Sequence, residues 1–208
     1  MTAPPLDDLL RHQAALRACR CCPAMLGPPV HGAATISPVF LLGQAPGTKE
    51  IEQGRPFCWT AGRTLFRWFA PLGLDEEAFR ARVYMSAVCR CFPGKNPKGG
   101  DRVPDAREVT QCARWWQGEV ALLRPRLILA VGKLAIARFM AVARLEQVVG
   151  QSWVYRHAGG AAEVIPLPHP SGASTWFKMM PGKALLEQAL ARIDAHPAWQ
   201  SLVRGQEP

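Results

Sequence analysis

Four short apolar runs, separated by segments with helical spacing, constrain the fold of this chain most strongly. The runs cover residues 38–42, 83–88, 127–131 and 164–168, and each is followed by Gly, Cys or Pro signals. Apolar runs of this length favour strands that are buried on both faces. Helices are predicted over residues 6–17, 61–72, 104–123, 133–144 and 182–196. This alternation predicts an α/β fold with a mainly parallel sheet.

The size and apolar content of the chain suit one domain. With 208 residues, of which 49% are hydrophobic, residues 1–208 can bury a single substantial core. The first residues lack the charged and apolar regions of a secretory signal, so we expect a protein of the bacterial cytosol or nucleoid. Lys133 and Arg138 interrupt the most apolar stretch, residues 127–142, which argues against a membrane span and a membrane partner.

The net charge of the chain is strongly positive. Lysine and arginine number 25 against 16 acidic residues, which gives a formal charge of +9 and an isoelectric point near 9.6. This balance favours a polyanionic partner, for which nucleic acid is the natural candidate. A basic enzyme with no such partner is the alternative, and charge alone does not separate the two.

Two short polar loops follow the first and last apolar runs. Residues 43–47 read Gly-Gln-Ala-Pro-Gly, and residues 169–172, 126 positions downstream, read His-Pro-Ser-Gly. In an open α/β sheet, ligands bind at the carboxyl ends of the strands. The two loops are therefore predicted to face one another across one site.

Seven cysteines raise the question of a metal site. Two pairs have suggestive spacing, and together they comprise Cys19, Cys22, Cys91 and Cys112. Four thiolates can hold an iron–sulfur cluster or a zinc ion. Scattered buried thiols are the alternative interpretation, and it suits Cys21, Cys58 and Cys89.

In their order along the chain, these motifs resemble the iron–sulfur class of the uracil-DNA glycosylase superfamily, as a mosaic of its family-four and family-five branches. Residues 43–47 are similar to the first active-site motif and His169-Pro170-Ser171 to the second. Residues 54–62 resemble the segment that supplies an aromatic platform, and residues 84–91 resemble a third-strand motif that ends in a ligand cysteine. The resemblance implies a three-layer αβα sandwich around a four-stranded, mainly parallel sheet.

The resemblance also implies a reaction. A uracil is flipped out of single- or double-stranded DNA, and hydrolysis of its N-glycosidic bond leaves an abasic site, the first step of base excision repair. The four paired cysteines would hold a structural [4Fe-4S] cluster, with zinc or no metal as alternatives. We expect the protein to act on DNA as a monomer.

The resemblance assigns roles to individual residues. Catalysis is expected from His169, Gln44 and Glu50. The uracil is expected to contact Gly43, Gln44, Ala45, Phe57, Ser86, Ala87 and His169. The DNA strand is expected to contact Ser171, Gly172, Ser174, Thr175 and Trp176, with Lys95, Lys98, Arg102 and Lys178 near phosphates and Trp176 or Phe177 as a wedge.

Two departures from the family pattern affect the mechanism. Many members carry an acidic residue in the first motif, whereas this chain has Gln44 and Ala45, so Glu50 or the Gln44 amide is left to act on water. Ala87 stands where one branch has an asparagine that reads uracil. A broader specificity for deaminated purines is therefore an alternative, as is a non-catalytic binder of damaged DNA. Residues 95–102 contain no histidine, so covalent capture of the product is not expected.

Overall fold

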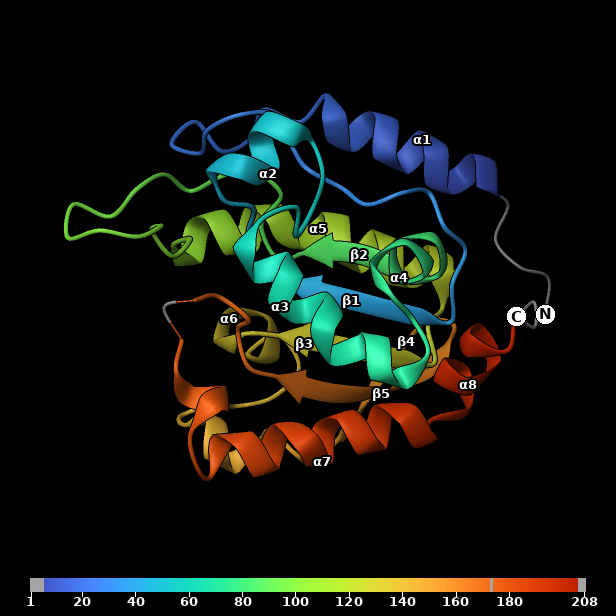
Figure 1. Ribbon diagram of the computed structural model, residues 1–208. Coiled ribbons are helices and arrows are strands. Elements are labelled where there is room, and N and C mark those ends of the chain that lie inside the picture. Colours follow the sequence, from blue (N-terminus) through green and yellow to red (C-terminus); the bar gives the residue numbers. More distant parts are fainter. Residues whose placement is uncertain (1–5, 173, 206–208) are drawn as a thin grey trace.

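The computed structural model describes residues 6–172 and 174–205. Its centre is a five-stranded sheet in the order β2-β1-β3-β5-β4 (Figure 1). The strands are β1 (Val39–Gly43), β2 (Tyr84–Ala87), β3 (Leu127–Val131), β4 (Trp153–His157) and β5 (Gly160–Leu167). Strands β2, β1, β3 and β5 are parallel, and they correspond to the four predicted runs. The mainly parallel sheet is thus confirmed.

The fifth strand, β4, was not predicted from the sequence. It pairs antiparallel with β5 at the edge of the sheet. Its residues alternate between half-buried and exposed, whereas every residue of β1 and β3 is buried. An edge strand that is buried on one face alternates between apolar and polar residues and forms no apolar run. Its signal in the sequence is therefore weaker than that of a central strand.

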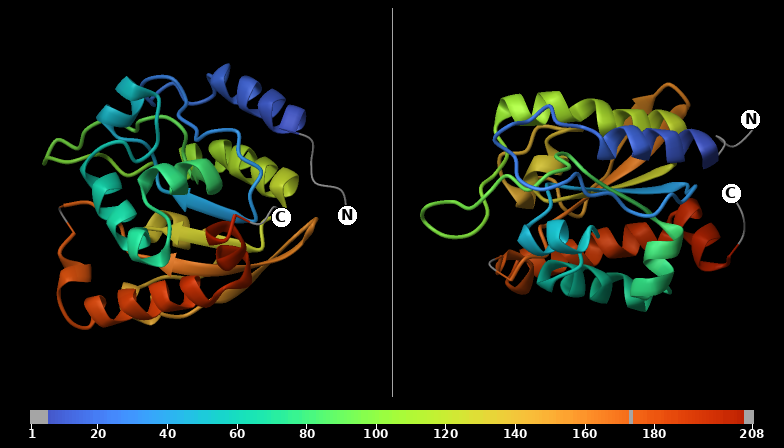
Figure 2. Two further views of the ribbon diagram at one scale, coloured as in Figure 1. Left: turned by 45° about the vertical axis from the view of Figure 1, so that its right-hand side comes forward. Right: turned by 90° about the horizontal axis from the view of Figure 1, so that it is seen from above.

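Helices cover both faces of the sheet. Figure 2 shows α1 (Leu6–Arg17) and α5 (Ala106–Leu123) on one face, and α3 (Thr60–Phe69), α4 (Glu76–Arg82) and α7 (Gly182–Ala195) on the other. The predicted three-layer αβα sandwich is therefore confirmed. The remaining helical elements are α2 (Thr48–Gln53), α6 (Lys133–Ile136), α8 (Pro197–Val203), and the 3₁₀ turns η1 (Ala70–Leu72), η2 (Leu145–Gln147) and η3 (Trp176–Lys178).

Some helix boundaries differ from the prediction for local reasons. The predicted helix 104–123 begins at Ala106, because Asp105 caps it by accepting a hydrogen bond from the Glu108 N–H group. The predicted helix 133–144 ends after one turn. After Ile136 the chain continues in turns, and the Lys133 amine donates to the Ala143 carbonyl at 2.8 Å. Helices α2, α4 and α8 were not predicted. Across the part of the chain that the structure describes, no helix has the length and apolarity that a membrane crossing requires.

The Gly- and Pro-rich segment after β2 forms a hairpin over residues 94–102. Lys95 and Asp101 form an antiparallel bridge at its base. The Arg102 N–H donates to the Gly94 carbonyl at 2.8 Å, and the Asn96 N–H donates to the Gly100 carbonyl at 2.9 Å. Figure 1 shows this hairpin projecting beyond the carboxyl ends of the strands, on the side where the two polar loops lie.

Candidate functional site

The sheet order brings the two polar loops to the same edge. Strand β3 lies between β1 and β5, and the Gly132 N–H after β3 donates to the Leu167 carbonyl at the end of β5. Gly132 has a positive φ of 88°, and a Cβ atom there would lie 2.8 Å from the side chain of Gln44. Glycine at this position therefore lets the first loop pass over the end of β3 toward the second.

We call this region the strand-end site. It comprises Gly43–Gly47, Phe57, Ala87, Gly132 and His169–Gly172. The Gln44 Oε1 atom accepts a hydrogen bond from the Leu134 N–H at 3.0 Å, in the first turn of α6. Only the amide nitrogen of Gln44 remains for a ligand. Within the described residues, no hydrogen bond engages the Ala45 N–H, so this group of the first loop is available as a donor.

Carboxylates reach the first loop from two neighbouring segments. The Glu50 Oε2 atom accepts a hydrogen bond from the Gly47 N–H at 3.0 Å, which closes the first turn of α2. A Cβ atom at Gly47 would lie 3.0 Å from this oxygen and 3.0 Å from the Oδ2 atom of Asp101. Asp101 was missed in the sequence, where it is the one acidic residue in a lysine- and glycine-rich loop.

Phe57 lies directly against the first loop. The edge of its ring is 3.1 Å from the position of a Cβ atom on Gly43. Its backbone has a φ of 52°, a conformation that is costly for a bulky residue. The Arg80 guanidinium donates to the carbonyls of Pro56 at 2.8 Å and of Phe57 at 2.9 Å. A Cβ atom at Gly62 would collide with the Phe57 carbonyl, so a glycine is required there.

The end of β2 presents one predicted contact residue and turns the other away. Ala87 pairs with Gly43, and register partners on adjacent strands point to the same face, so Ala87 lies on the Phe57 side. The buried Ser86 hydroxyl instead donates to the Glu119 Oε2 atom at 2.6 Å. The expected role of Ser86 in binding a base can therefore involve only its main chain.

His169 has a defined tautomer. The Ser171 N–H donates to its Nδ1 atom at 3.3 Å, so the ring proton of the neutral form lies on Nε2. Burial lowers the pKa of His169 below its usual value, and the nearby charge of Asp101 opposes the shift without cancelling it. The ring is thus a neutral hydrogen-bond donor at neutral pH.

The residues expected to contact DNA after His169 differ in exposure. Gly172 and Thr175 are exposed, and Ser171 and Ser174 are half-buried. The half-buried Trp176 is tied down, because its indole N–H donates to the Glu146 Oε1 atom at 2.5 Å. Phe177 is only 9% exposed and packs edge-to-face on Trp68, so it is not placed to act as a wedge.

Two of the predicted phosphate-binding cations are paired within the protein. Arg102 forms a bidentate ion pair with Glu108, at 2.7 and 2.8 Å. The Lys95 amine lies 2.7 Å from the Asp101 Oδ1 atom. Lys98 and Lys178 are exposed, and their contact with phosphates stays a prediction.

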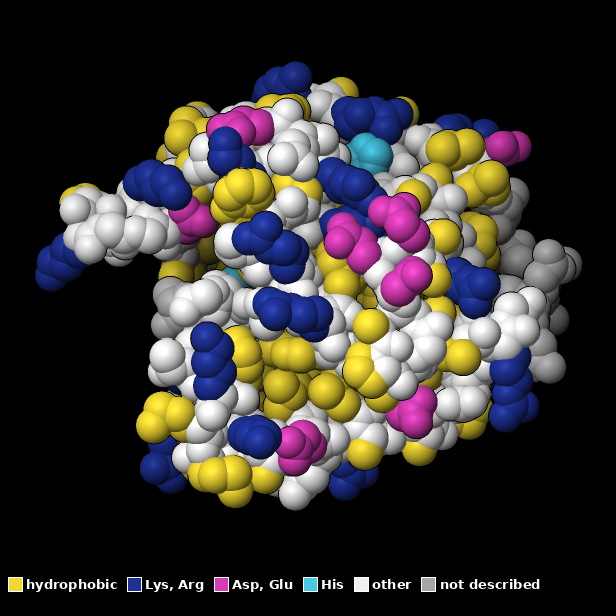
Figure 3. Space-filling view, in the orientation of Figure 1, with side chains coloured by type: hydrophobic (Ala, Val, Ile, Leu, Met, Phe, Trp, Pro, Cys, Tyr) yellow, Lys and Arg dark blue, Asp and Glu magenta, His cyan; other side chains and the backbone are white. Residues whose placement is uncertain are grey.

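A groove of about 350 Å³ adjoins the second loop. Its lining residues are Thr64, Arg67, Trp68, Gly172, Phe177 and Lys178. Figure 3 shows a hydrophobic floor in the hollow between α3 and α7, with Lys and Arg side chains around it. An apolar floor with a cationic rim suits a polyanion that carries flat apolar groups.

The four predicted ligand cysteines lie on one cavity. This cavity of about 280 Å³, which we call the cysteine cavity, is lined by Cys19 and Cys22 after α1, by Cys91 after β2 and by Cys112 on α5. Cys21 also lines it, and its sulfur accepts a hydrogen bond from Arg114 at 3.0 Å. Three segments that are distant in the sequence therefore place their thiols around one space.

The thiols share one cavity, but those described do not form a ready-made site for a metal ion. A tetrahedral zinc ion with Zn–S bonds near 2.3 Å needs sulfurs about 3.8 Å apart. Among the described residues, no group of three or more His, Cys, Asp or Glu side chains is gathered tightly enough to hold one ion. Burial, with the neighbouring Cys112 and Cys19, raises the pKa of Cys91 to about 12. A bound metal group would stabilise the thiolate form.

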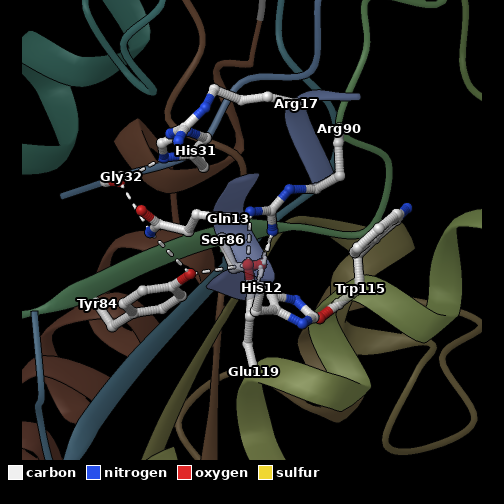
Figure 4. Close-up of polar contacts among 10 residues, drawn as sticks. All are labelled: His12, Gln13, Arg17, His31, Gly32, Tyr84, Ser86, Arg90, Trp115 and Glu119. Atoms are coloured by element: carbon white, nitrogen blue, oxygen red, sulfur yellow. Dashed lines mark hydrogen bonds and ion pairs between the residues drawn. The ribbon is translucent and has the colours of Figure 1, made fainter. Parts of the chain in front are cut away.

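A buried charge network, shown in Figure 4, reaches the cysteine cavity through Arg90. The Arg90 Nη2 atom lies 2.7 Å from the Glu119 Oε1 atom, and neither side chain is more than 1% exposed. Tyr84 donates to the same carboxylate at 2.8 Å and accepts from Gln13 at 3.3 Å. Sequence reasoning missed Arg90, although a charged residue between Cys89 and Cys91 in an apolar run was a usable signal.

One nitrogen of this network is a buried hydrogen-bond donor that a ligand in the cavity could satisfy. The Arg90 Nε atom is buried without a hydrogen-bond partner among the described residues, and Arg90 lines the cysteine cavity. An unpaired buried donor is costly. A sulfur-containing anionic cluster on the four cysteines would supply an acceptor, so the residues present fit such a group.

Comparisons with known proteins agree with this geometry. A sequence profile of the Uracil DNA glycosylase superfamily matches residues 29–193. The chain belongs to the uracil-DNA glycosylase superfamily. It is 31% identical over 138 residues to the type-4 uracil-DNA glycosylase of Pyrobaculum aerophilum, which covers 64% of this chain and 66% of the relative. For the type-4 enzyme of Archaeoglobus fulgidus the identity is 29%, with 64% and 65% covered.

The second branch of the superfamily also matches. The type-5 uracil-DNA glycosylase of Thermus thermophilus is 32% identical over 114 residues, which cover 50% of this chain and 49% of the relative. Similarity to both types confirms the mosaic inferred from the motifs. The chain spans less than two thirds of the length of the type-4 relatives described above.

Proposed function

We propose that this protein is a monofunctional DNA glycosylase that removes uracil from DNA by hydrolysing its N-glycosidic bond. The observation that carries this proposal is the neutral His169, whose Nε2–H donor is fixed by the hydrogen bond from Ser171 to Nδ1. The similarity to type-4 and type-5 uracil-DNA glycosylases supports the same conclusion.

Binding of the base follows from Phe57 and the first loop. An extruded uracil would stack on the Phe57 ring, which Arg80 holds against Gly43. The Ala45 N–H and the amide nitrogen of Gln44 would donate to the carbonyl oxygens of the base. These groups are held in place before the DNA arrives, so little reorganisation is needed on binding.

Bond cleavage depends on stabilising the leaving group. When the C1′–N1 bond breaks, negative charge spreads over the uracil oxygens, and the Nε2–H of His169 would donate to one of them. Burial keeps His169 neutral, so it acts through a hydrogen bond and does not itself give up a proton. The Glu50 carboxylate lies at the first loop, but one of its oxygens already accepts the Gly47 N–H.

The cysteine cavity has a structural role in this proposal. Cys19, Cys22, Cys91 and Cys112 would hold a [4Fe-4S] cluster, with Arg90 donating to it from Nε. When bound, the cluster would tie the segment after α1 to the end of β2 and to α5. It takes no part in the hydrolytic step.

DNA would lie across the second loop and the neighbouring groove. Ser171, Ser174 and Thr175 would contact phosphates, with Arg67 and Lys178 on the groove rim. We propose that the protein acts on uracil-containing DNA as a monomer in the bacterial cytosol or nucleoid. Trp176 would contribute as a fixed wall of the site, because Glu146 holds its indole.

A broader substrate range is the second candidate. Ala87 lies on the Phe57 side of the sheet and offers no amide to distinguish uracil from other deaminated bases. Hypoxanthine and xanthine would therefore meet less discrimination than in a site with an asparagine at this position.

A panel of oligonucleotides tests both candidates. The duplex and single strand each carry one uracil, hypoxanthine or xanthine, and alkali-induced cleavage after incubation reports the abasic product. We expect product from uracil, with hypoxanthine second. Binding to the damaged strands without product at long incubation would replace the enzyme with a non-catalytic binder.

A further inference from the structure

The first loop lacks a carboxylate of its own, yet the fold supplies one from the hairpin. The Asp101 Oδ2 atom lies 3.0 Å from the position of a Cβ on Gly47. Any side chain at residue 47 would displace it. Glycine at this position therefore brings the hairpin carboxylate against the loop that holds the base in the proposed function.

Neighbouring contacts hold the backbone at Asp101, while its side chain is 45% exposed. It lies at the base of the hairpin, where it bridges Lys95, and not at the tip. The next residue, Arg102, is clamped by its bidentate pair with Glu108 and donates from Nε to the Pro93 carbonyl at 2.8 Å. A group that positions water must be held in this way.

The two oxygens of Asp101 are used differently. Lys95 binds Oδ1 at 2.7 Å, whereas no hydrogen bond within the described residues engages Oδ2, the oxygen that faces Gly47. Glu50, the other carboxylate at this loop, has its Oε2 atom occupied by the Gly47 N–H. Within the described residues each carboxylate thus keeps one oxygen without a hydrogen bond, Oδ2 of Asp101 and Oε1 of Glu50, and Asp101 is the one whose charge acts on His169.

Asp101 also lies within electrostatic range of the second loop. Its charge acts on His169 and partly opposes the effect of burial on the pKa of that ring. The charged and titratable groups around Asp101 are therefore Lys95 on the hairpin, Glu50 on α2 and His169 after β5. The carboxylate therefore lies against the first loop and acts through its charge on the histidine of the second.

We propose that Asp101 positions and deprotonates the water that attacks the sugar. This inference rests on the proposed glycosylase function. The C1′–N1 bond breaks and its electron pair leaves with uracil. The water oxygen then bonds to C1′, and its proton passes to the Asp101 carboxylate and on to solvent, while the uracil anion takes a proton from solvent. A general base of this kind contributes about 10²–10⁴-fold to a rate.

Single-turnover cleavage of a uracil-containing strand tests the inference with four variants. Asp101→Asn should lower the rate by about 10²-fold, while affinity for DNA carrying 2′-fluoro-deoxyuridine, which resists cleavage, stays within a few-fold of the original. Glu77→Gln makes the same charge change on the exposed surface of α4 and should leave both quantities unchanged. Glu50→Gln keeps an oxygen for the Gly47 N–H and should cost less than Asp101→Asn.

Lys95→Met separates catalysis from hairpin structure. It removes the ion pair but keeps the carboxylate, so we expect a far smaller loss than with Asp101→Asn. Equal losses in the two variants, or an Asp101→Asn rate within about threefold of the original, would overturn the role of Asp101. If the unaltered protein releases no uracil at all, the proposed function itself fails. That result is distinct from the two outcomes that would overturn the role of Asp101 alone.

Discussion

The cysteine cavity and the strand-end site both include residues that follow strand β2, but different forces hold their residues. At the cysteine cavity, the buried Arg90–Glu119 pair fixes neighbouring side chains. At the strand-end site, main-chain groups hold the functional residues: Arg80 binds two carbonyls, and Ser171 donates its N–H to His169. The buried ion pair at the cysteine cavity stabilises the fold. The contacts at the strand-end site hold the strained backbone of Phe57 and leave hydrogen-bond donors available to a ligand.

The largest expected effect is a loss of stability on breaking the buried Arg90–Glu119 ion pair. Arg90→Met leaves the Glu119 carboxylate buried without its cation, and we expect the free energy of unfolding to fall by about 3–5 kcal/mol. Denaturant unfolding measures this change. The double variant Arg90→Met/Glu119→Leu should recover much of the loss, because no charge is then left unpaired.

Arg11→Met is the matched control, since its pair with Asp8 is exposed on α1 and such pairs contribute little. If the double variant were no more stable than Arg90→Met, the burial of an unpaired charge would not explain the loss.

The second prediction concerns His169. His169→Ala removes the donor to the leaving uracil, so the single-turnover rate should fall by about 10²–10³-fold, while DNA affinity changes little. His157→Ala, at the opposite end of β5, should retain the rate. Equal losses of rate and affinity in His169→Ala would assign the histidine a structural role.

The third prediction concerns the support of Phe57. Arg80→Met removes two hydrogen bonds to the carbonyls of Pro56 and Phe57. We expect kcat/KM to fall about tenfold, because hydrogen bonds from a charged group are typically worth about 1.5–3 kcal/mol and some of that energy positions the ring.

Arg82→Met on the same helix is the control. Arg82 donates to the Leu202 carbonyl at 2.7 Å, so this variant should lose stability but keep kcat/KM. If Arg80→Met and Arg82→Met each lost kcat/KM in proportion to their loss of stability, the position of the Phe57 ring would not depend on Arg80 in particular.

The smallest effect concerns pH. Burial lowers the pKa values of His31, His169 and His196 in the folded protein. The unfolded chain therefore binds more protons below about pH 6.5, and the free energy of unfolding should fall as the pH drops through that value. Protonated His169 also cannot accept the Ser171 N–H at Nδ1, so the cleavage rate should fall below its lowered pKa. A free energy of unfolding that does not fall as the pH drops below about 6.5 would contradict the expected loss of stability.

Much of the fold could be predicted because its signals are local. The four central strands are apolar runs, and Asp105 and Glu108 mark the start of α5 within four residues. The edge strand β4 shows only a weak alternation. Helix α6 gives way to turns after Ile136, which the helical spacing of residues 133–144 did not indicate.

The sequence by itself determined the order of the strands along the chain, the two polar loops at strand ends and the four cysteines. Periodicity and spacing are properties of neighbouring residues, so they can be read without the fold. The tertiary structure decided which atoms are available. It ties the Gln44 oxygen to α6, turns Ser86 toward Glu119, and brings Asp101 to Gly47 from 54 residues away. Hydrogen-bond partners distant in sequence set these outcomes, because a polar group is available to a ligand only when no other group satisfies it.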